Sequence, residues 1–325
     1  MVTSCAAPSI GFIILSHEKD TKLSRLIAAL NREYDAPPIV VHHDLSQADR
    51  DICEFPHNVR FVRPSLRTGW AKWSVVDGAL RGLRMLFEHD GPDWFFLLSA
   101  ADYPIMRGSA VRTELGTTAC DAFIDARPIE PSIRPRAKII GEYNQKLSHF
   151  AAEDNRALKW RLMCGLQIWL PIIRLKPRLR PGKFTFRPNV EGRHPFSNTF
   201  GCFYGDHWFT GNRRAAQALL EPSATNVRLQ AHLRHRTQAD ESYYATMLAN
   251  AHGLTLCRNN RRFAEWNGGG AHPIILSERE IAEGLTSGAF FARKMPDDDR
   301  LAQLIDTYLG KLEFDGDKAK DISTQ

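Results

Sequence analysis

Residues 94–104 read WFFLLSAADYP. The run of large apolar side chains is typical of a strand buried on both faces, as in a parallel sheet covered by helices. Asp102 follows this run, and ligands of open α/β sheets bind beyond the carboxyl ends of the strands. A turn carboxylate before Pro104 would explain Asp102 without any ligand. The choice between the two depends on what the rest of the chain provides.

The segments around this strand alternate between strand and helix patterns. We predict strands at residues 9–16, 38–43, 58–62 and 122–125, and helices at 21–34, 74–89, 213–220 and 240–250. Such alternation predicts an α/β fold with a mixed, mostly parallel sheet flanked by helices. A hydrophobic content of 43% over 325 residues is ample for a core.

Composition narrows the class of protein. The first apolar stretch, residues 10–15, is too short to span a bilayer and follows no basic region, so we expect neither a transmembrane helix nor a signal peptide. The six cysteines are scattered singly, which favours reduced thiols in a cytoplasm over a zinc site or a disulfide framework. A net charge of +6 suits a nucleotide diphosphate, an anionic membrane face or a nucleic acid.

The middle of the chain interrupts the alternation with a basic, proline-containing region. Within it, residues 158–175 mix tryptophan, leucine and isoleucine with lysine and arginine. A membrane-surface segment, an apolar acceptor site and a plain helix over the core each explain this composition. The predicted organisation is a nucleotide-binding half (1–130), a variable insertion (131–196), an acceptor and catalytic half (197–312) and a polar tail (313–325).

Short motifs with polar or aromatic side chains recur between the predicted elements. In chain order they are Ile14-Leu15-Ser16-His17, His42-His43-Asp44, Trp73-Ser74, residues 98–104, Gly205-Asp206-His207-Trp208-Phe209, Asp240-Glu241-Ser242-Tyr243-Tyr244, Trp266 and Phe291-Ala292-Arg293-Lys294. Taken singly, an acidic pair that opens a helix is explained by capping, and two cations after two aromatics by a solvated helix end.

Taken together and in this order, the motifs resemble the core-2/I-branching family of glycosyltransferases, which includes β-1,6-N-acetylglucosaminyltransferases and peptide O-xylosyltransferases. The resemblance implies a GT-A-like nucleotide-sugar-binding fold that lacks the Asp-x-Asp metal motif and inverts the anomeric centre without a metal. The one Asp-x-Asp, within Asp297-Asp298-Asp299, lies in a polar stretch and is expected to face solvent. We therefore expect no metal and no cofactor beside the donor substrate.

The resemblance assigns roles to particular residues. Glu241 matches the general base, which takes the proton of an acceptor hydroxyl as it attacks the anomeric carbon. Arg293 and Lys294 match the cations that neutralise the departing UDP diphosphate in place of a metal. Uracil and ribose contacts map onto Ser16, His17, His42 and Asp44. The donor and acceptor pocket maps onto Trp73, Asp102, Asp206, Trp208, Asp240 and Trp266.

The expected function is transfer of N-acetylglucosamine or xylose from a UDP-sugar to a hydroxyl of a glycan, lipid-linked or peptide acceptor. A bacterial-type, cytoplasmic enzyme of surface polysaccharide synthesis fits, with residues 158–175 offering a peripheral contact to the inner membrane face. The xylosyltransferase branch is the closer likeness at 98–105, 259–267 and 290–294, but His207 stands where that branch has an acidic residue.

Two other classes are weighed against a transferase. A sugar-nucleotide-binding protein with a decayed active site would need neither Glu241 nor the cationic pair, and both are present. A nucleic-acid-binding protein would use the basic residues 174–193, but the chain carries no RNA- or DNA-binding fold signature. The glycine run at 268–270 lacks the strand-turn-helix context of a dinucleotide fingerprint, which argues against an oxidoreductase.

Overall fold

The computed structural model describes residues 7–129, 195–234, 238–266 and 272–311, together with the backbone of 176–180, 183–187 and 312–322. The predicted amphipathic stretch at 158–175, the glycine run at 268–270 and most of the predicted insertion lie outside these residues. In the part that is described, no helix is long and apolar enough to cross a membrane.

The core of the molecule is a seven-stranded sheet in the order β12-β6-β11-β4-β1-β2-β3. Its strands are β1 Ile10–Ser16, β2 Ile39–His43, β3 Val59–Phe61, β4 Trp94–Ser99, β6 Ala122–Phe123, β11 Thr210–Asn212 and β12 Leu256–Cys257. Neighbouring strands pair in parallel except at β11, which runs antiparallel to both β4 and β6. The predicted mixed, mostly parallel sheet is confirmed.

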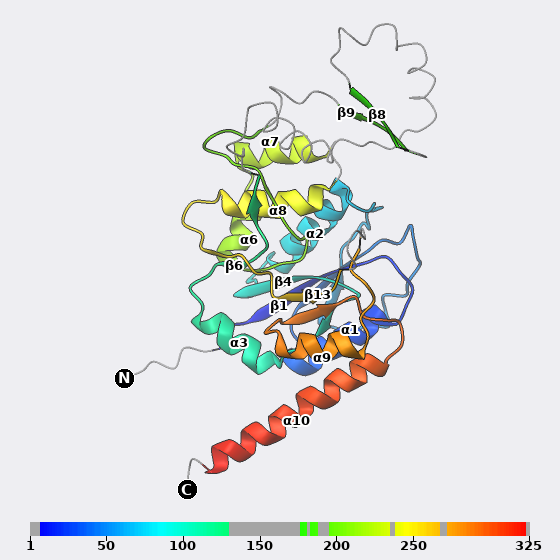
Figure 1. The fold of residues 1–325 in the computed structure, drawn as a ribbon, viewed down its shortest axis with the longest axis vertical. Helices are drawn as coiled ribbons and strands as arrows, with labels where there is room; N and C mark the ends of the chain where they lie inside the picture. Colours follow the sequence, from blue (N-terminus) through cyan, green and yellow to red (C-terminus); the bar gives the residue numbers. More distant parts are fainter. Residues whose placement is uncertain are drawn as a thin grey trace.

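Helices cover both faces of this sheet (Figure 1). One face carries α2 Trp73–Leu86, α6 Arg213–Leu220, α7 Ala224–Leu233 and α8 Ala239–Ala249. The other face carries α1 Lys22–Tyr34, α3 Gly108–Thr117, α9 Glu278–Thr286 and α10 Arg300–Ile322. The sheet is thus the middle of three layers, with an apolar core on each side.

Strand β4 shows why the sequence folds this way. Side chains alternate across a strand, so Phe95 and Leu97 pack with α2, α6 and α8 while Phe96 and Leu98 pack with α1 and α3. All four are buried. A strand with two apolar faces is stable only between two layers, and the run at residues 94–98 meets that condition.

A smaller three-stranded sheet stands at the carboxyl end of β4. It contains β5 Tyr103–Pro104, β14 Phe291–Arg293 and β13 Arg262–Ala264, with β14 parallel to β13 and antiparallel to β5. The alternative of a solvated helix end at 290–294 is therefore wrong, because Phe291, Ala292 and Arg293 are buried strand residues. Two further pairs are β7 Arg127–Pro128 with β10 Phe203–Tyr204, and β8 Lys176–Arg180 with β9 Lys183–Arg187.

The expectation of reduced thiols is wrong at one pair of cysteines. Cys120 and Cys257 form a disulfide, with their Cα atoms 5.8 Å apart. Parallel pairing of β12 with β6 sets Cys257 opposite Phe123, so two cysteines 137 residues apart become neighbours. Cys53 and Cys202 are free. The thiol argument for a cytoplasmic location loses its basis, because disulfides persist mainly in oxidising compartments.

Candidate active site

A cleft of about 470 Å³ opens where β1, β2 and β4 end. Its wall also includes residues 68–71, the start of α8 and the ends of β13 and β14. Most of the predicted site residues meet on it, namely Ser16, His17, His42, Asp206, Trp208, Asp240, Glu241, Trp266, Arg293 and Lys294. The carboxyl end of the sheet is where ligands of α/β folds bind, so this cleft is the candidate active site.

Asp44 lies behind the cleft and does not line it. Its carboxylate accepts hydrogen bonds from Ser46, from Gln47 Nε2 at 2.6 Å and from the Thr68 backbone N–H at 2.7 Å. Burial would raise the pKa of Asp44, but these donors outweigh it and hold the pKa well below its usual value. The protein itself uses the acceptor capacity of Asp44, which fixes the two cleft residues Gln47 and Thr68.

Asp102 also lies below the cleft, 1% exposed. Its Oδ1 is 3.4 Å from Nε of Arg293, whose guanidinium lies 4.5 Å from the centre of the Trp208 ring. Burial raises the pKa of Asp102, while the charges of Arg293 and Arg262 act against that rise. Asp102 therefore holds Arg293 in place against Trp208, and only the edge of Arg293 reaches the cleft.

Trp73 belongs to the core of the helical layer. It is 8% exposed, and its ring meets the edge of Tyr243 on α8 with centroids 5.2 Å apart. The structure does not bring Trp73 to the cleft wall, where Trp208 and Trp266 both lie. Its position at the first residue of α2 instead joins that helix to α8.

The acidic pair opens α8 at the cleft. Glu241 Oε2 accepts a hydrogen bond from Gln238 Nε2 at 3.1 Å, and Asp240 Oδ1 accepts from the Glu241 backbone N–H at 3.2 Å. The N-cap residue of the helix is Gln238, and its side chain accepts no hydrogen bond from the backbone N–H groups of the first turn. Burial, together with the charges of Glu241 and Asp206, raises the pKa of Asp240 to about 7. Capping alone does not account for this pair, because both side chains line the cleft.

Lys294 provides the accessible positive charge of the cleft. It follows β14 and makes no ion pair with the other residues that the structure describes, although Arg293 beside it is tied to Asp102. Burial and the charge of Arg293 lower the pKa of Lys294. An ammonium in this position is available to an anionic group of a ligand.

Several cleft residues were missed by the sequence analysis. Trp70 is 65% exposed, and its ring lies 5.2 Å from that of His272. His207 is buried between Trp208 and Tyr244, and this burial lowers its pKa to about 3, so the ring is neutral. Trp70 lies only three residues before the core residue Trp73. Local sequence does not distinguish a tryptophan on a cleft wall from one in the core, so the exposure of Trp70 could not be predicted.

The described residues hold no group of three or more histidine, cysteine, aspartate or glutamate side chains placed to bind a metal. Asp297, Asp298 and Asp299 are exposed, as expected. Asp297 pairs with Lys22 and Asp299 with Arg25, both on α1 and away from the cleft wall.

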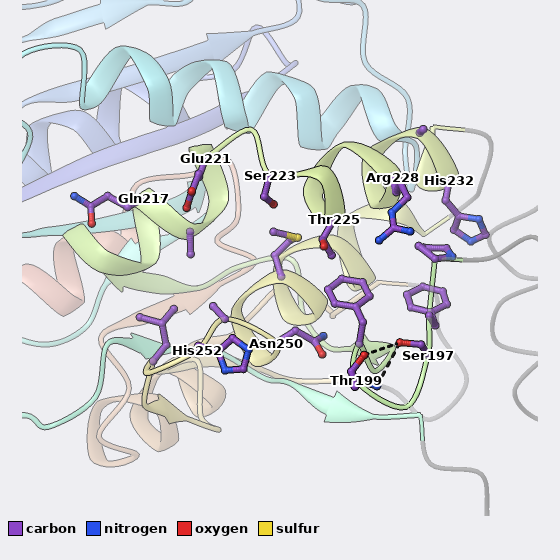
Figure 2. A pocket seen from close by; sticks show the side chains of 18 of the residues that line it. Ser197, Thr199, Gln217, Glu221, Ser223, Thr225, Arg228, His232, Asn250 and His252 are labelled. Atoms are coloured by element: carbon purple, nitrogen blue, oxygen red, sulfur yellow. Dashed lines mark hydrogen bonds between the residues drawn. The ribbon is translucent and has the colours of Figure 1, made fainter.

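A second, larger hollow of about 1160 Å³ lies between α6, α7, α8 and residues 195–200. Figure 2 shows side chains that line it, with Gln217 on α6, Arg228 and His232 on α7, Asn250 after α8, and Ser197 and Thr199 in the segment before β10. None of the predicted site residues lines it. Although this hollow is larger, we assign the active site to the smaller cleft, because the acidic pair and the cations Arg293 and Lys294 lie there.

The fold and the cleft define an α/β protein with a polar site at the carboxyl ends of its strands. The family described as Core-2/I-Branching enzyme matches residues 10–167 and 173–287, and the chain belongs to that family. Membership implies glycosyltransferase activity with a nucleotide-sugar donor and a glycan acceptor, and the architecture is the GT-A-like fold. A comparison with curated proteins found no match. The matched residues include Glu241 but end before Arg293 and Lys294.

Proposed function

We propose that the protein is an inverting glycosyltransferase that uses a UDP-sugar and needs no metal ion. The observation that carries the proposal is the meeting of Glu241 and Lys294 on one cleft at the carboxyl end of the sheet. A carboxylate and a cation are the two groups that such a transfer needs, one for the acceptor proton and one for the leaving diphosphate.

In the proposed reaction, an acceptor hydroxyl oxygen forms a bond to the anomeric carbon as the bond from that carbon to the UDP oxygen breaks. Glu241 takes the hydroxyl proton, and UDP leaves with the electron pair of the broken bond. Gln238 holds one oxygen of the Glu241 carboxylate. The exposed indole of Trp266, on the same wall, offers a flat apolar face to the C–H groups of an acceptor sugar.

At the nucleotide end, Lys294 supplies charge to the diphosphate, and Arg293 reaches the same region from its site above Asp102. Ser16, His17 and His42 end the first two strands on the side where a base and ribose would lie. N-acetylglucosamine and xylose are the proposed donor sugars, and a glycan, a lipid-linked glycan or a peptide of a surface-polysaccharide pathway is the proposed acceptor.

Calorimetry with UDP, UDP-xylose, UDP-N-acetylglucosamine and UDP-glucuronic acid in the presence of EDTA tests the proposal. We expect one UDP-sugar to bind, and Lys294→Ala to weaken that binding about ten- to a hundredfold, the usual cost of a lost hydrogen bond to a charged group. Lys311→Ala is the matched control, because it removes the same charge from the exposed side of α10. Binding that requires a divalent ion would overturn the metal-free mechanism.

A second variant separates binding from chemistry. Glu241→Gln keeps the size of the side chain and removes the base, so we expect donor affinity to remain and transfer to fall by about 10²–10⁴-fold. Loss of donor binding in this variant would contradict the role given to Glu241.

A further inference from the structure

His272 lies on the wall of the cleft beside Lys294. The chain here is held by backbone hydrogen bonds: Leu276 N–H donates to the Lys294 carbonyl at 2.9 Å, and Lys294 N–H donates to the Ile274 carbonyl at 3.5 Å. Ile274 N–H also donates to the Glu265 carbonyl at 2.9 Å. These bonds set residues 274–276, which follow His272 closely in the chain, alongside the cation that the proposed function gives to the diphosphate.

The imidazole of His272 is placed to receive a ligand. It is exposed, and its ring lies 5.2 Å from that of Trp70 in an edge-on arrangement. Within the described part of the chain, neither ring nitrogen makes a hydrogen bond to a protein group. An imidazole has two nitrogens, and both donate when the ring is protonated.

The charges that face His272 are of one sign. Lys294 and Arg293 come from the end of β14, and Trp70 on the other side is uncharged. Partial burial and the two cations lower the pKa of His272, so the ring is neutral in the empty cleft near pH 7. A bound diphosphate would reverse this field, because an anion within about 4–6 Å favours the protonated imidazole.

We propose that His272 contacts the diphosphate of the donor nucleotide next to Lys294, and that it takes up a proton from solvent when it does so. The inference rests on the proposed function, since it needs a nucleotide in this cleft. Binding is then coupled to proton uptake, and affinity rises as the pH falls. Release of UDP returns the proton to solvent, so a more alkaline medium favours product release.

The test uses UDP as the probe, with calorimetry from pH 6 to pH 8 in buffers of different ionisation enthalpy. Wild type is compared with His272→Gln, which keeps a donor but cannot change its charge, and with His272→Arg, which is always charged. UDP titrates its own terminal phosphate near pH 6, and the difference between wild type and His272→Gln cancels that contribution. His89→Gln is the matched control, because His89 is an exposed histidine that does not line the cleft.

We expect wild type to take up more protons per UDP than His272→Gln, and its affinity to fall about three- to tenfold more than that of His272→Gln between pH 6 and pH 8. His272→Arg should bind at pH 8 at least as tightly as wild type. Equal proton uptake by wild type and His272→Gln, or loss of the coupling in His89→Gln instead, would overturn the inference alone. Absence of UDP binding to wild type at every pH would overturn the proposed function as well.

Discussion

Asp240 is a site residue whose ionisation lowers the stability of the folded protein. Its carboxyl is buried next to Glu241 and within reach of the charge of Asp206, and its pKa is raised to about 7. In the unfolded chain an aspartate ionises near pH 4. Between these values the folded state binds more protons than the unfolded state, so Asp240 makes the folded state less stable as the pH rises from about 4 to about 7.

Asp240→Asn removes this pH-dependent cost. We expect little change in the free energy of unfolding at pH 3, where the carboxyl is mostly protonated in both states, and a gain of about 1–3 kcal/mol at pH 8. The amide keeps the oxygen that accepts from the Glu241 N–H. Urea unfolding at the two pH values measures the difference. An equal effect at both would show that Asp240 ionises normally.

Two other carboxylates, each at the end of a strand, show how much of the site could be predicted from the sequence. Asp44 and Asp102 were both predicted to contact a ligand because each follows a buried strand. Sequence locates such a carboxylate at the site but does not show whether protein donors already occupy it. Thr68 and Gln47 donate hydrogen bonds to the Asp44 carboxylate, and Arg293 lies against Asp102. Both residues stay next to the cleft and act on its wall.

At the scale of elements, the long patterned segments and the short strands β3 and β6 were predictable, but other short strands were not. The apolar periodicity of β1, α1, β2, α2, β4 and α6 is local, so it marks these elements within a few residues. Strands β5 and β14 have two and three residues, and they exist through pairing between Ala292 and Tyr103, far apart in the chain. No local pattern reports such a pairing, which is why 290–294 also allowed a helix end.

The disulfide is a second long-range feature of the same kind. It ties the segment just before β6 to the end of β12 at the edge of the main sheet, across 137 residues. A disulfide typically stabilises the folded state by about 2–4 kcal/mol, because it restricts the unfolded chain. We expect Cys120→Ser with Cys257→Ser to lower the free energy of unfolding by this amount.

Urea unfolding of wild type with and without a reductant gives the matching measurement, since reduction should reproduce the double variant. Cys53→Ser is the control, because Cys53 is exposed and free. Thiol titration of the unfolded protein reports the bond directly. If wild type and the double variant unfold at the same urea concentration, the pair is not oxidised in the isolated protein.

At the scale of the whole molecule, the cleft depends on segments from both ends of the chain. The first half provides Ser16, His17 and Trp70, and the second half provides Glu241 and Lys294. The two halves share one sheet, because β11 lies between β4 and β6. The motif order allowed this assembly to be predicted through the family resemblance, whereas the wall made by Trp70 and His272 could not be, since only the fold brings 70 and 272 together.

The nucleotide could bind in the smaller cleft or in the larger hollow, and hydrogen exchange distinguishes the two sites. Binding protects those backbone amides whose opening would break the site, by up to about a hundredfold when UDP is at 100 times its Kd. If the smaller cleft binds UDP, residues 16–17, 68–71, 274–276 and 293–295 should exchange more slowly, because they form its wall or adjoin the residues that do. Residues 195–200 and 223–232, around the larger hollow, should be unchanged. Slower exchange confined to the second set would move the nucleotide to the larger hollow and leave Glu241 and Lys294 without a donor to act on.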